Sequence, residues 1–356
     1  MEGRWFMHRS FRYGVGCLVV LCLVGFRSPA ASAAQARRVV TDMCGREVSL
    51  PPHIEHVVTA GGTPAVNALL FALGKGGTIV NGLPPVMRSR WKWQAVFAPQ
   101  LADAPTVSSM GPAWVPDLEH LQMLPHDVVF VDSRATAESL AERGMTTVCL
   151  SWRDPQAILK DITLLGDVME CPAQAQAYLD YMRDVIRRVA GRLADLPREK
   201  RRTVLYLRVI PLGAPMINTN RFLAEKAGGR YACPADLPLD NPGINIEQLL
   251  VWNPDVILVW SAHERQLLLS DSRFRDLTAV RDKAVIVVPF GAHAWTHATP
   301  EQAVAILWLA KLLYPDRFAD LDMQQEAQAF YKRFFKTDLT TAQLREILRI
   351  GSGGSQ

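Results

Sequence analysis

Residues 117–131 read DLEHLQMLPHDVVFV and residues 245–259 read NIEQLLVWNPDVILV, an internal repeat with an offset of 128 positions. Each copy begins with a residue that caps helices well, Asp117 or Asn245, and carries a glutamate in the first helical turn. Each copy then ends in a run of Val, Ile, Leu and Phe without alternation. Such runs are typical of strands covered on both faces, as in parallel sheets flanked by helices. The repeat therefore predicts two similar α/β halves.

Further strand candidates outside the repeat extend this pattern. Helical stretches separate most of them, and strands that alternate with helices predict βαβ units. We therefore expect two Rossmann-like lobes with mainly parallel sheets. The additional candidates are Glu55–Thr59, Gly77–Val80, Thr146–Leu150, Thr203–Arg208 and Ala284–Val288.

One long helix is predicted between the two halves. From Pro172 to Leu196, apolar residues recur every three or four positions, and Pro172 suits a first helical turn. A helix of this length spans roughly 37 Å, enough to connect two lobes while allowing little hinge motion. Chains of this size usually form two domains. The predicted division is a signal peptide at 1–34, an N-terminal lobe at 35–171, the inter-lobe helix at 172–197, a C-terminal lobe at 198–350 and a flexible tail at 351–356.

The first 34 residues have the layout of a secretory signal peptide. Three early arginines precede an uncharged run, Val15–Phe26, and cleavage options follow at Ala33 and Ala34. This run is well short of the roughly 20 residues that a membrane-spanning helix requires. A permanent membrane anchor is the alternative interpretation. We expect cleavage and a soluble periplasmic protein.

Charge and cysteine content exclude several classes of partner and site. The signal segment holds four arginines and one glutamate, so most of the net charge of +4 belongs to targeting. In the mature chain no run of Lys or Arg interleaved with aromatic residues suggests a nucleic-acid surface, and the cluster Arg198–Arg202 is typical of a solvated linker. Four cysteines without a C-x-x-C motif argue against a clustered zinc site, and one disulfide of unspecified pairing is possible. These four are Cys44, Cys149, Cys171 and Cys233.

Four segments, in order along the chain, resemble the class III periplasmic binding proteins of iron–siderophore, haem and cobalamin ABC importers. Residues 42–51, DMCGREVSLP, resemble the family's D-x-x-G-R-x-V-x-x-P opening, and both repeat copies resemble its N-L-E-x-L-L-x-L-x-P-D-V-V segment. Residues 275–289, RDLTAVRDKAVIVVP, resemble a late element that Trp295 and Thr299-Pro300-Glu301 follow. The first repeat copy departs from the pattern with Asp117 in place of Asn and with Pro125-His126-Asp127.

This resemblance implies a function and a set of partners. It implies a monomeric, non-enzymatic receptor that binds a metal chelate between two lobes joined by a helix, without a cofactor of its own. The partners would be an ABC permease dimer and its cytoplasmic ATPase. Glu119 and Glu247 hold equivalent positions in the two copies, and the resemblance implies that they dock on permease arginines. Their first-turn position alone is also explained by the helix dipole.

Candidate ligand-binding residues follow from the rule that open α/β sheets bind ligands beyond the carboxyl ends of their strands. Tryptophan offers large apolar contact faces and arginine pairs with anionic groups, which suits a bulky or anionic chelate. Trp91 lies in a basic stretch that is predicted to form a flap, and core packing is the alternative role for each tryptophan. The predicted residues are Thr59, Gly62, Trp91, Trp114, Arg134, Trp152, Arg153, Arg208, Asn218, Trp260, His293 and Trp295.

Two alternatives to a chelate receptor remain at this point. His293 and His297 form an H-x-x-x-H pair, which binds metal when it lies on a helix, whereas here it is predicted in a loop. One alternative is a receptor for a nickel or cobalt complex or for a molybdate-type oxyanion. The other is a periplasmic metal or tetrapyrrole chelatase that uses His293, or His263 with Glu264. The sequence has no nucleophile elbow, P-loop, dinucleotide motif or zinc-protease motif.

Overall fold

The computed structural model describes residues 38–107, 116–151, 155–235, 237 and 242–351. The described chain opens with an antiparallel hairpin of β1 (Arg38–Thr41) and β2 (Glu47–Leu50). Asp42 closes its turn by accepting hydrogen bonds from the backbone N–H groups of Cys44 and Arg46, at 3.0 and 2.9 Å. The predicted signal peptide lies outside the described residues.

The first parallel sheet has the strand order β3-β4-β5. Its strands are β3 (Val57–Thr59), β4 (Val128–Val131) and β5 (Thr147–Cys149), and they are fully buried, as their apolar runs predict. The strand predicted at Gly77–Val80 is instead the 3-10 turn η1 (Gly76–Thr78) with a single bridge from Ile79 to Val57. The accompanying helices are α1 (Thr63–Ala72), α2 (Pro85–Arg88), α3 (Gln94–Phe97), η2 (Pro99–Ala102), α4 (Leu118–Met123), α5 (Arg134–Ala141) and α6 (Pro155–Val168).

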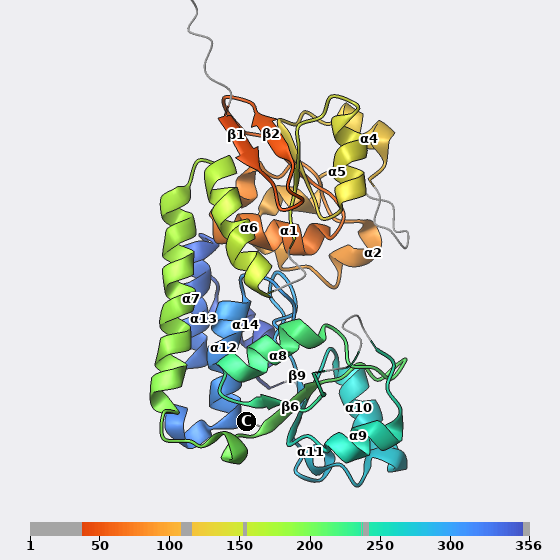
Figure 1. Cartoon of the computed structure of the whole chain (residues 1–356), viewed down its shortest axis with the longest axis vertical. Coiled ribbons are helices and arrows are strands. Elements are labelled where there is room, and N and C mark those ends of the chain that lie inside the picture. The colour runs from red at the N-terminus through yellow and green to blue at the C-terminus, as the bar shows by residue number, and fades with distance from the viewer. Residues whose placement is uncertain (1–37, 108–115, 152–154, 236, 238–241, 352–356) are drawn as a thin grey trace, which may run out of the picture. The chain divides into compact units, whose positions relative to one another are not determined.

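The second parallel sheet has the order β7-β6-β8-β9. Its strands are β6 (Thr203–Tyr206), β7 (Arg230–Tyr231), β8 (Val256–Val259) and β9 (Val285–Val287). Figure 1 shows helices on both sides of this sheet. The helices and 3-10 turns that follow α7 in the chain are η3 (Arg198–Lys200), α8 (Ile217–Lys226), α9 (Ile246–Trp252), α10 (Ala262–Ser270), η4 (Ser272–Phe274), α11 (Thr278–Arg281), α12 (Gln302–Leu313), η5 (Pro315–Phe318), α13 (Met323–Phe334) and α14 (Thr341–Ile347).

The internal repeat forms the same unit twice, a short capped helix followed by a buried strand. Asp117 caps α4 by accepting from the N–H groups of Glu119 and His120, and β4 follows. Asn245 caps α9 in a capping box with Gln248, and β8 follows. The helix-then-strand prediction from the repeat is confirmed in both copies.

A single long helix, α7 (Pro172–Arg192), lies between the two sheets in the chain order and runs along one side of the molecule (Figure 1). Its buried face consists of Ala175, Tyr178, Met182, Val185 and Val189. It ends before the predicted Leu196, because Leu193 already has a non-helical backbone. Two parallel sheets joined by one long helix confirm the predicted α/β class. One cluster of buried apolar side chains includes residues from both halves of the chain. The predicted domain boundaries therefore stay a prediction.

One disulfide joins Cys44, in the β1–β2 turn, to Cys149 at the end of β5. The described residues hold no other disulfide, and Cys171 and Cys233 are the remaining described cysteines. Among the residues that the structure describes, no helix is both long enough and apolar enough to cross a membrane.

Candidate functional site

The carboxyl edge of the first sheet is closed by internal hydrogen bonds. Thr59, the last residue of β3, donates its backbone N–H to the Oδ1 of Asn81 at 2.8 Å and its hydroxyl to the Oδ1 of Asn67 at 2.7 Å. Asn81 returns a hydrogen bond from Nδ2 to the Thr59 carbonyl at 2.9 Å. All three side chains are buried. The predicted ligand residue Thr59 therefore has its polar groups satisfied by the protein itself.

The beginning of α1 lies at the same edge and faces a carboxylate of the chain. The backbone N–H of Gly62 donates to the Oδ2 of Asp132 at 3.3 Å. Gly61 has a φ of +76°, and a Cβ at this position would lie 2.0 Å from the Oδ1 of Asp132. The glycine therefore lets this carboxylate approach the positive end of the helix. An anionic ligand at Gly62 would have to displace or repel Asp132.

Of the other ligand residues predicted at this edge, the structure describes Arg134. Arg134, at the start of α5, pairs with Glu138 at 2.8 Å and is mostly exposed. Trp114, Trp152 and Arg153 lie outside the described residues.

The carboxyl edge of the second sheet carries a cluster of aromatic rings. Trp260 directly follows β8 and Phe290 follows β9, and their ring centroids are 5.4 Å apart. Trp91 comes from the segment between α2 and α3 and contacts both rings, at 6.4 and 6.0 Å. Its centroid is also 5.6 Å from that of His293. The structure therefore brings together three predicted residues from distant parts of the sequence.

A pocket of about 510 Å³ opens beside this aromatic cluster. The guanidinium of Arg90 lies over the rings of Trp91 and Trp260, with its Cζ at 5.9 and 5.7 Å from their centroids. Lys92 forms an ion pair with Glu346 of α14. Within the described residues Arg90 has no ion-pair partner. The pocket is lined by Ser89, Arg90, Lys92, Trp93, Trp260, Ser261, Ala262, Val287, Phe290, Glu346 and Arg349.

Two ring nitrogens in the aromatic cluster are buried without a hydrogen-bond partner among the described residues. They are Nε1 of Trp91 and Nδ1 of His297. Burial lowers the pKa of His297 to about 3, and burial with the neighbouring His297 lowers that of His293, so both imidazoles are neutral at pH 7. An indole N–H can only donate, and a buried donor without a partner is unfavourable. A bound group that accepts hydrogen bonds would satisfy this donor.

A buried carboxyl group positions the loop that carries His293. The two oxygens of Glu301 accept from the backbone N–H groups of Ala292 and His293, at 2.9 and 2.8 Å. The Tyr331 hydroxyl donates to the same carboxyl at 2.5 Å. Burial raises the pKa of Glu301 to about 7. Gln94 also fixes this loop by donating to the Ala292 carbonyl at 3.0 Å.

The remaining predicted residues lie elsewhere. Trp295 is fully buried, packs against Trp308 and donates to the Tyr331 hydroxyl, so it belongs to the core. Arg208 donates to the Pro211 carbonyl within its own loop, at 3.0 Å, and Asn218 is an exposed residue of α8. Glu119 and Glu247 are exposed in the first turns of α4 and α9.

The geometry offers limited support for direct metal binding. The rings of His293 and His297 are 4.1 Å apart between centroids. However, Nδ1 of His293 accepts from the Ala294 N–H at 2.9 Å. Among the described residues, no group of three or more His, Cys, Asp or Glu side chains could hold a metal ion. A metal held by this pair would need its other ligands from a chelating molecule.

The model of a family described as periplasmic binding protein matches residues 62–292. The chain belongs to this family. The match covers β4 and β5 of the first sheet, α7 and the whole second sheet. The predicted family resemblance is thereby confirmed.

Individual relatives are proteins of the same kind. The molybdate-binding protein MolA of Haemophilus influenzae is 27% identical over 347 residues, 90% of this chain and 96% of MolA. The structure of MolA bound to molybdate matches with a TM-score of 0.74 and 25% identity, over 85% of this chain and 99% of MolA. A periplasmic solute binding protein of Veillonella parvula matches with a TM-score of 0.75 and 24% identity, over 88% and 97% of the two chains.

The Veillonella match and a third one are each under 25% identical and show the fold alone. The Ni–His complex of Helicobacter pylori CeuE has a TM-score of 0.69 and 17% identity, over 88% of this chain and 99% of CeuE.

Sequence reasoning did not include Arg90 and Phe290 among the ligand residues. Arg90 lies within the basic, tryptophan-containing stretch RSRWKW at residues 88–93, which was predicted to form a flap. That composition was the available signal. Phe290 could have been selected by the strand-end rule, since it comes three residues after the end of β9.

Proposed function

We propose that this periplasmic binding protein is the solute receptor of an ABC importer and captures an anionic, metal-containing ligand. The chain would be exported through a cleaved signal peptide and would deliver its ligand to a permease dimer with a cytoplasmic ATPase. Family membership and the similarity to MolA support the transport role. The ligand class rests on the pocket at the ends of β8 and β9.

The proposed class of ligand rests mainly on the environment of Arg90. Its guanidinium has no ion-pair partner among the described residues and lies over two tryptophan rings beside the pocket. The buried Nε1 of Trp91 adds a donor that lacks an acceptor among the described residues. Guanidinium and indole groups donate hydrogen bonds and do not accept them. The site therefore favours an occupant rich in acceptor oxygens and negative charge.

A bulky anionic chelate is the first candidate. The pocket volume of about 510 Å³ lies within the range of small-molecule sites. Trp260 and Phe290 provide apolar ring surface beside the charged groups, which suits the organic part of a chelate. The neutral imidazoles of His293 and His297 lie in the same cluster. This combination supports an iron–siderophore or haem-like ligand, or a nickel complex.

A tetrahedral oxyanion of the molybdate type is the second candidate. The similarity to MolA over 90% of the chain favours it. A small oxyanion would use Arg90 and Trp91 as donors and would leave part of the pocket to water. The two candidates thus share the donors and differ in how much ring surface they cover.

Glu119 and Glu247 are our candidates for permease docking. Both carboxylates are exposed, and both occupy the second position of the helix in equivalent repeat copies. Two separated negative charges would orient the receptor on a positively charged partner. Changing both to Gln should reduce transport and leave ligand affinity unchanged, and a loss of affinity would contradict this role.

The ligand class is tested by titrating the tryptophan fluorescence of residues 35–350. The panel contains haem, cobalamin, ferric catecholate and hydroxamate chelates, nickel–histidine and molybdate. Trp260 lines the pocket and the Trp91 ring packs against it, so a bound ligand should change the tryptophan emission. We expect saturation at one equivalent with one anionic class. Saturation by molybdate alone would select the oxyanion.

Two outcomes would contradict the proposal. One is the absence of saturable binding for every member of the panel. The other is turnover, measured as metal insertion into a porphyrin or as hydrolysis of the chelate. Turnover would favour a chelatase, with His293 or the pair of His263 and Glu264 as the groups to reassign.

A further inference from the structure

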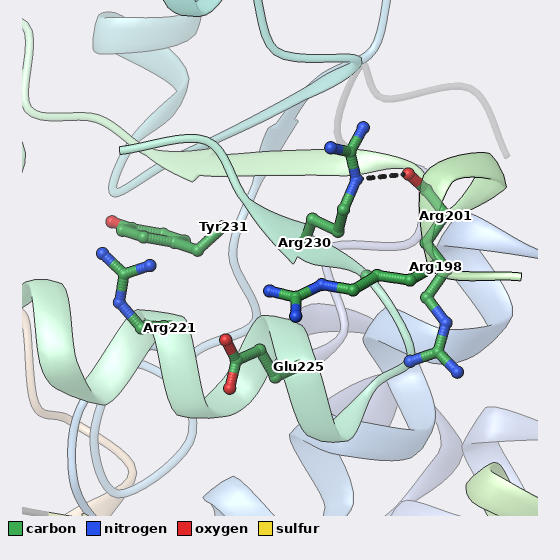
Figure 2. A pocket seen from close by; sticks show the side chains of 7 residues that line it. Arg198, Arg201, Arg221, Glu225, Arg230 and Tyr231 are labelled. Atoms are coloured by element: carbon green, nitrogen blue, oxygen red, sulfur yellow. Dashed lines mark hydrogen bonds between the residues drawn. The ribbon is translucent and has the colours of Figure 1, made fainter. Parts of the chain in front are cut away.

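A second pocket, of about 390 Å³, lies at the opposite end of the second sheet from the aromatic cluster. Arg198 and Arg201 precede β6, and Arg230 opens β7, so this pocket is at the amino ends of the strands. Figure 2 shows its side chains coming from η3, from Arg201 just after η3, from α8 and from β7. Its lining residues are Arg198, Arg201, Arg221, Glu225, Gly229, Arg230 and Tyr231.

The charge of this pocket is unbalanced. Four arginines line it and Glu225 is the acidic residue among the lining side chains. Within the described residues, none of the four arginines forms an ion pair. By contrast, Arg188 pairs with Glu326 at 2.6 Å, Arg192 with Asp320 at 2.6 Å, and Arg317 with Asp195. The arginine pocket is therefore a local concentration of uncompensated positive charge.

Backbone carbonyls hold three of these arginines in place. Arg221 donates to the carbonyls of Cys233 and Pro234 at 2.8 and 2.9 Å, and its guanidinium lies 5.4 Å from the Tyr231 ring centroid. The Nε of Arg230 donates to the Arg201 carbonyl at 3.2 Å. Arg201 donates to the Leu196 carbonyl at 3.4 Å. A guanidinium has five N–H donors, so each side chain is positioned and keeps donors for another group.

Arg198 differs from the other three arginines because no backbone carbonyl of the described residues holds its side chain. It is exposed, and Figure 2 shows its side chain reaching between β7 and α8 toward Glu225. The structure has no ion pair between these two residues. A long exposed side chain of this kind can move onto an anion that enters the pocket, and it brings a planar pair of donors.

From this geometry we infer that the arginine pocket is a second anion site, which binds a phosphate-class polyanion. Arginine pairs bidentately with phosphate oxygens, and several guanidinium groups around one pocket match more than one phosphate group. The pocket is also larger than a single tetrahedral oxyanion requires. The site is separate from the aromatic pocket, so neither proposal depends on the other.

The test compares pyrophosphate binding by the mature wild-type chain and by an Arg198→Ser, Arg230→Ser double variant. Both residues are exposed, so the variant should fold. Isothermal titration at 150 mM salt should give one saturable site in the wild type and at least about tenfold weaker binding in the variant. The control is Arg183→Ser with Arg187→Ser, two exposed arginines of α7 whose loss changes the net charge equally. The control should bind like the wild type.

A second arm identifies the source of the phosphate. Flotation with vesicles of phosphatidylglycerol and phosphatidylcholine tests a lipid headgroup in place of a free anion. Binding to either probe that the double variant loses and the control keeps supports the site. Absence of binding to both probes, or equal binding by variant and control, overturns it. Fluorescence titration of the aromatic pocket is unaffected in each case, which separates this test from that of the proposed function.

Discussion

The carboxyl edges of the two parallel sheets arise from the same repeat and are used differently. At the edge of β3–β5, Thr59 is bonded to two buried asparagines, Asp132 faces the start of α1, and Cys149 is joined to Cys44. At the edge of β8–β9, Trp260 and Phe290 border an open pocket. Both sheets thus offer strand ends at which a ligand could bind, but of these two edges only that of β8–β9 has buried donors without a partner among the described residues.

The largest expected effect concerns the carboxyl edge of β3–β5, which we call the closed edge. Replacing Cys44 and Cys149 together by Ser should lower the free energy of unfolding by about 4 kcal/mol, because the disulfide spans 105 residues and constrains the unfolded chain. Urea unfolding measures this change. Cys171→Ser, outside any disulfide, is the control. Ligand affinity of the folded double variant should match the wild type, and a large loss of affinity would place the binding site at this edge instead.

The next effect concerns the carboxyl edge of β8–β9, which we call the open edge. Arg90→Gln should weaken binding of the panel's anionic ligand about 100-fold, the usual range for a lost hydrogen bond to a charged group. The matched control is Arg134→Gln, at the closed edge, where the guanidinium is paired with Glu138. Titration calorimetry gives both affinities. Equal losses in the two variants would remove the distinction between the edges.

A pH effect is expected from Glu301, whose carboxyl group accepts hydrogen bonds from the loop that carries His293 at the open edge. Its pKa is raised to about 7 by burial, so the folded chain holds a proton that the unfolded chain, with a pKa of 4.5, releases. This stabilisation is complete below pH 4.5 and is lost as the pH rises through 7. Relative to Glu301→Gln, the wild type should therefore lose about 2 kcal/mol of stability between pH 5 and pH 8.

Thermal unfolding of both proteins across this range measures the difference. Tyr178, Trp295, Tyr331 and the neutral His293 and His297 surround this carboxyl group or its loop in both proteins. Because the histidines are present in both, their own titration largely cancels in the comparison. A difference that is constant with pH would show that Glu301 keeps one protonation state.

The smallest effect is expected at Thr59. Thr59→Val keeps the shape of the side chain and removes the hydroxyl that donates to Asn67, so stability should fall by about 1 kcal/mol. Ligand affinity should not change, because this hydroxyl lies in a network within the protein. Thr63→Val, whose hydroxyl contacts backbone carbonyls of the same turn, is a neighbouring comparison. A selective loss of affinity in Thr59→Val would contradict the structural role.

The sequence predicted the fold well because apolar runs and helix caps are local signals. The buried strands β4 and β8, the caps Asp117 and Asn245, and most of α7 could each be identified from neighbouring residues. The strand predicted at Gly77–Val80 was wrong over most of its length, where two glycines begin a 3-10 turn and only Ile79 pairs.

The site was less predictable because it depends on contacts between distant segments. Nothing near Trp295 indicates that it packs against Trp308 and bonds to Tyr331, which removes it from the pocket. Likewise, Gly62 follows a strand, as a glycine that binds an anionic ligand would. Its N–H instead donates to the carboxylate of Asp132, 70 positions later in the chain. Arg90 reaches the second sheet from a segment before β4.

The central claim is that the ligand occupies the open edge beside Arg90, Trp91 and Trp260. Crystals of the mature chain grown with the metal-containing ligand that saturates in the panel would locate it directly, through an anomalous difference map at the absorption edge of its metal. We predict one strong peak beside these three residues. A strong peak at Gly62 and Asp132, with none at the aromatic cluster, would contradict the account.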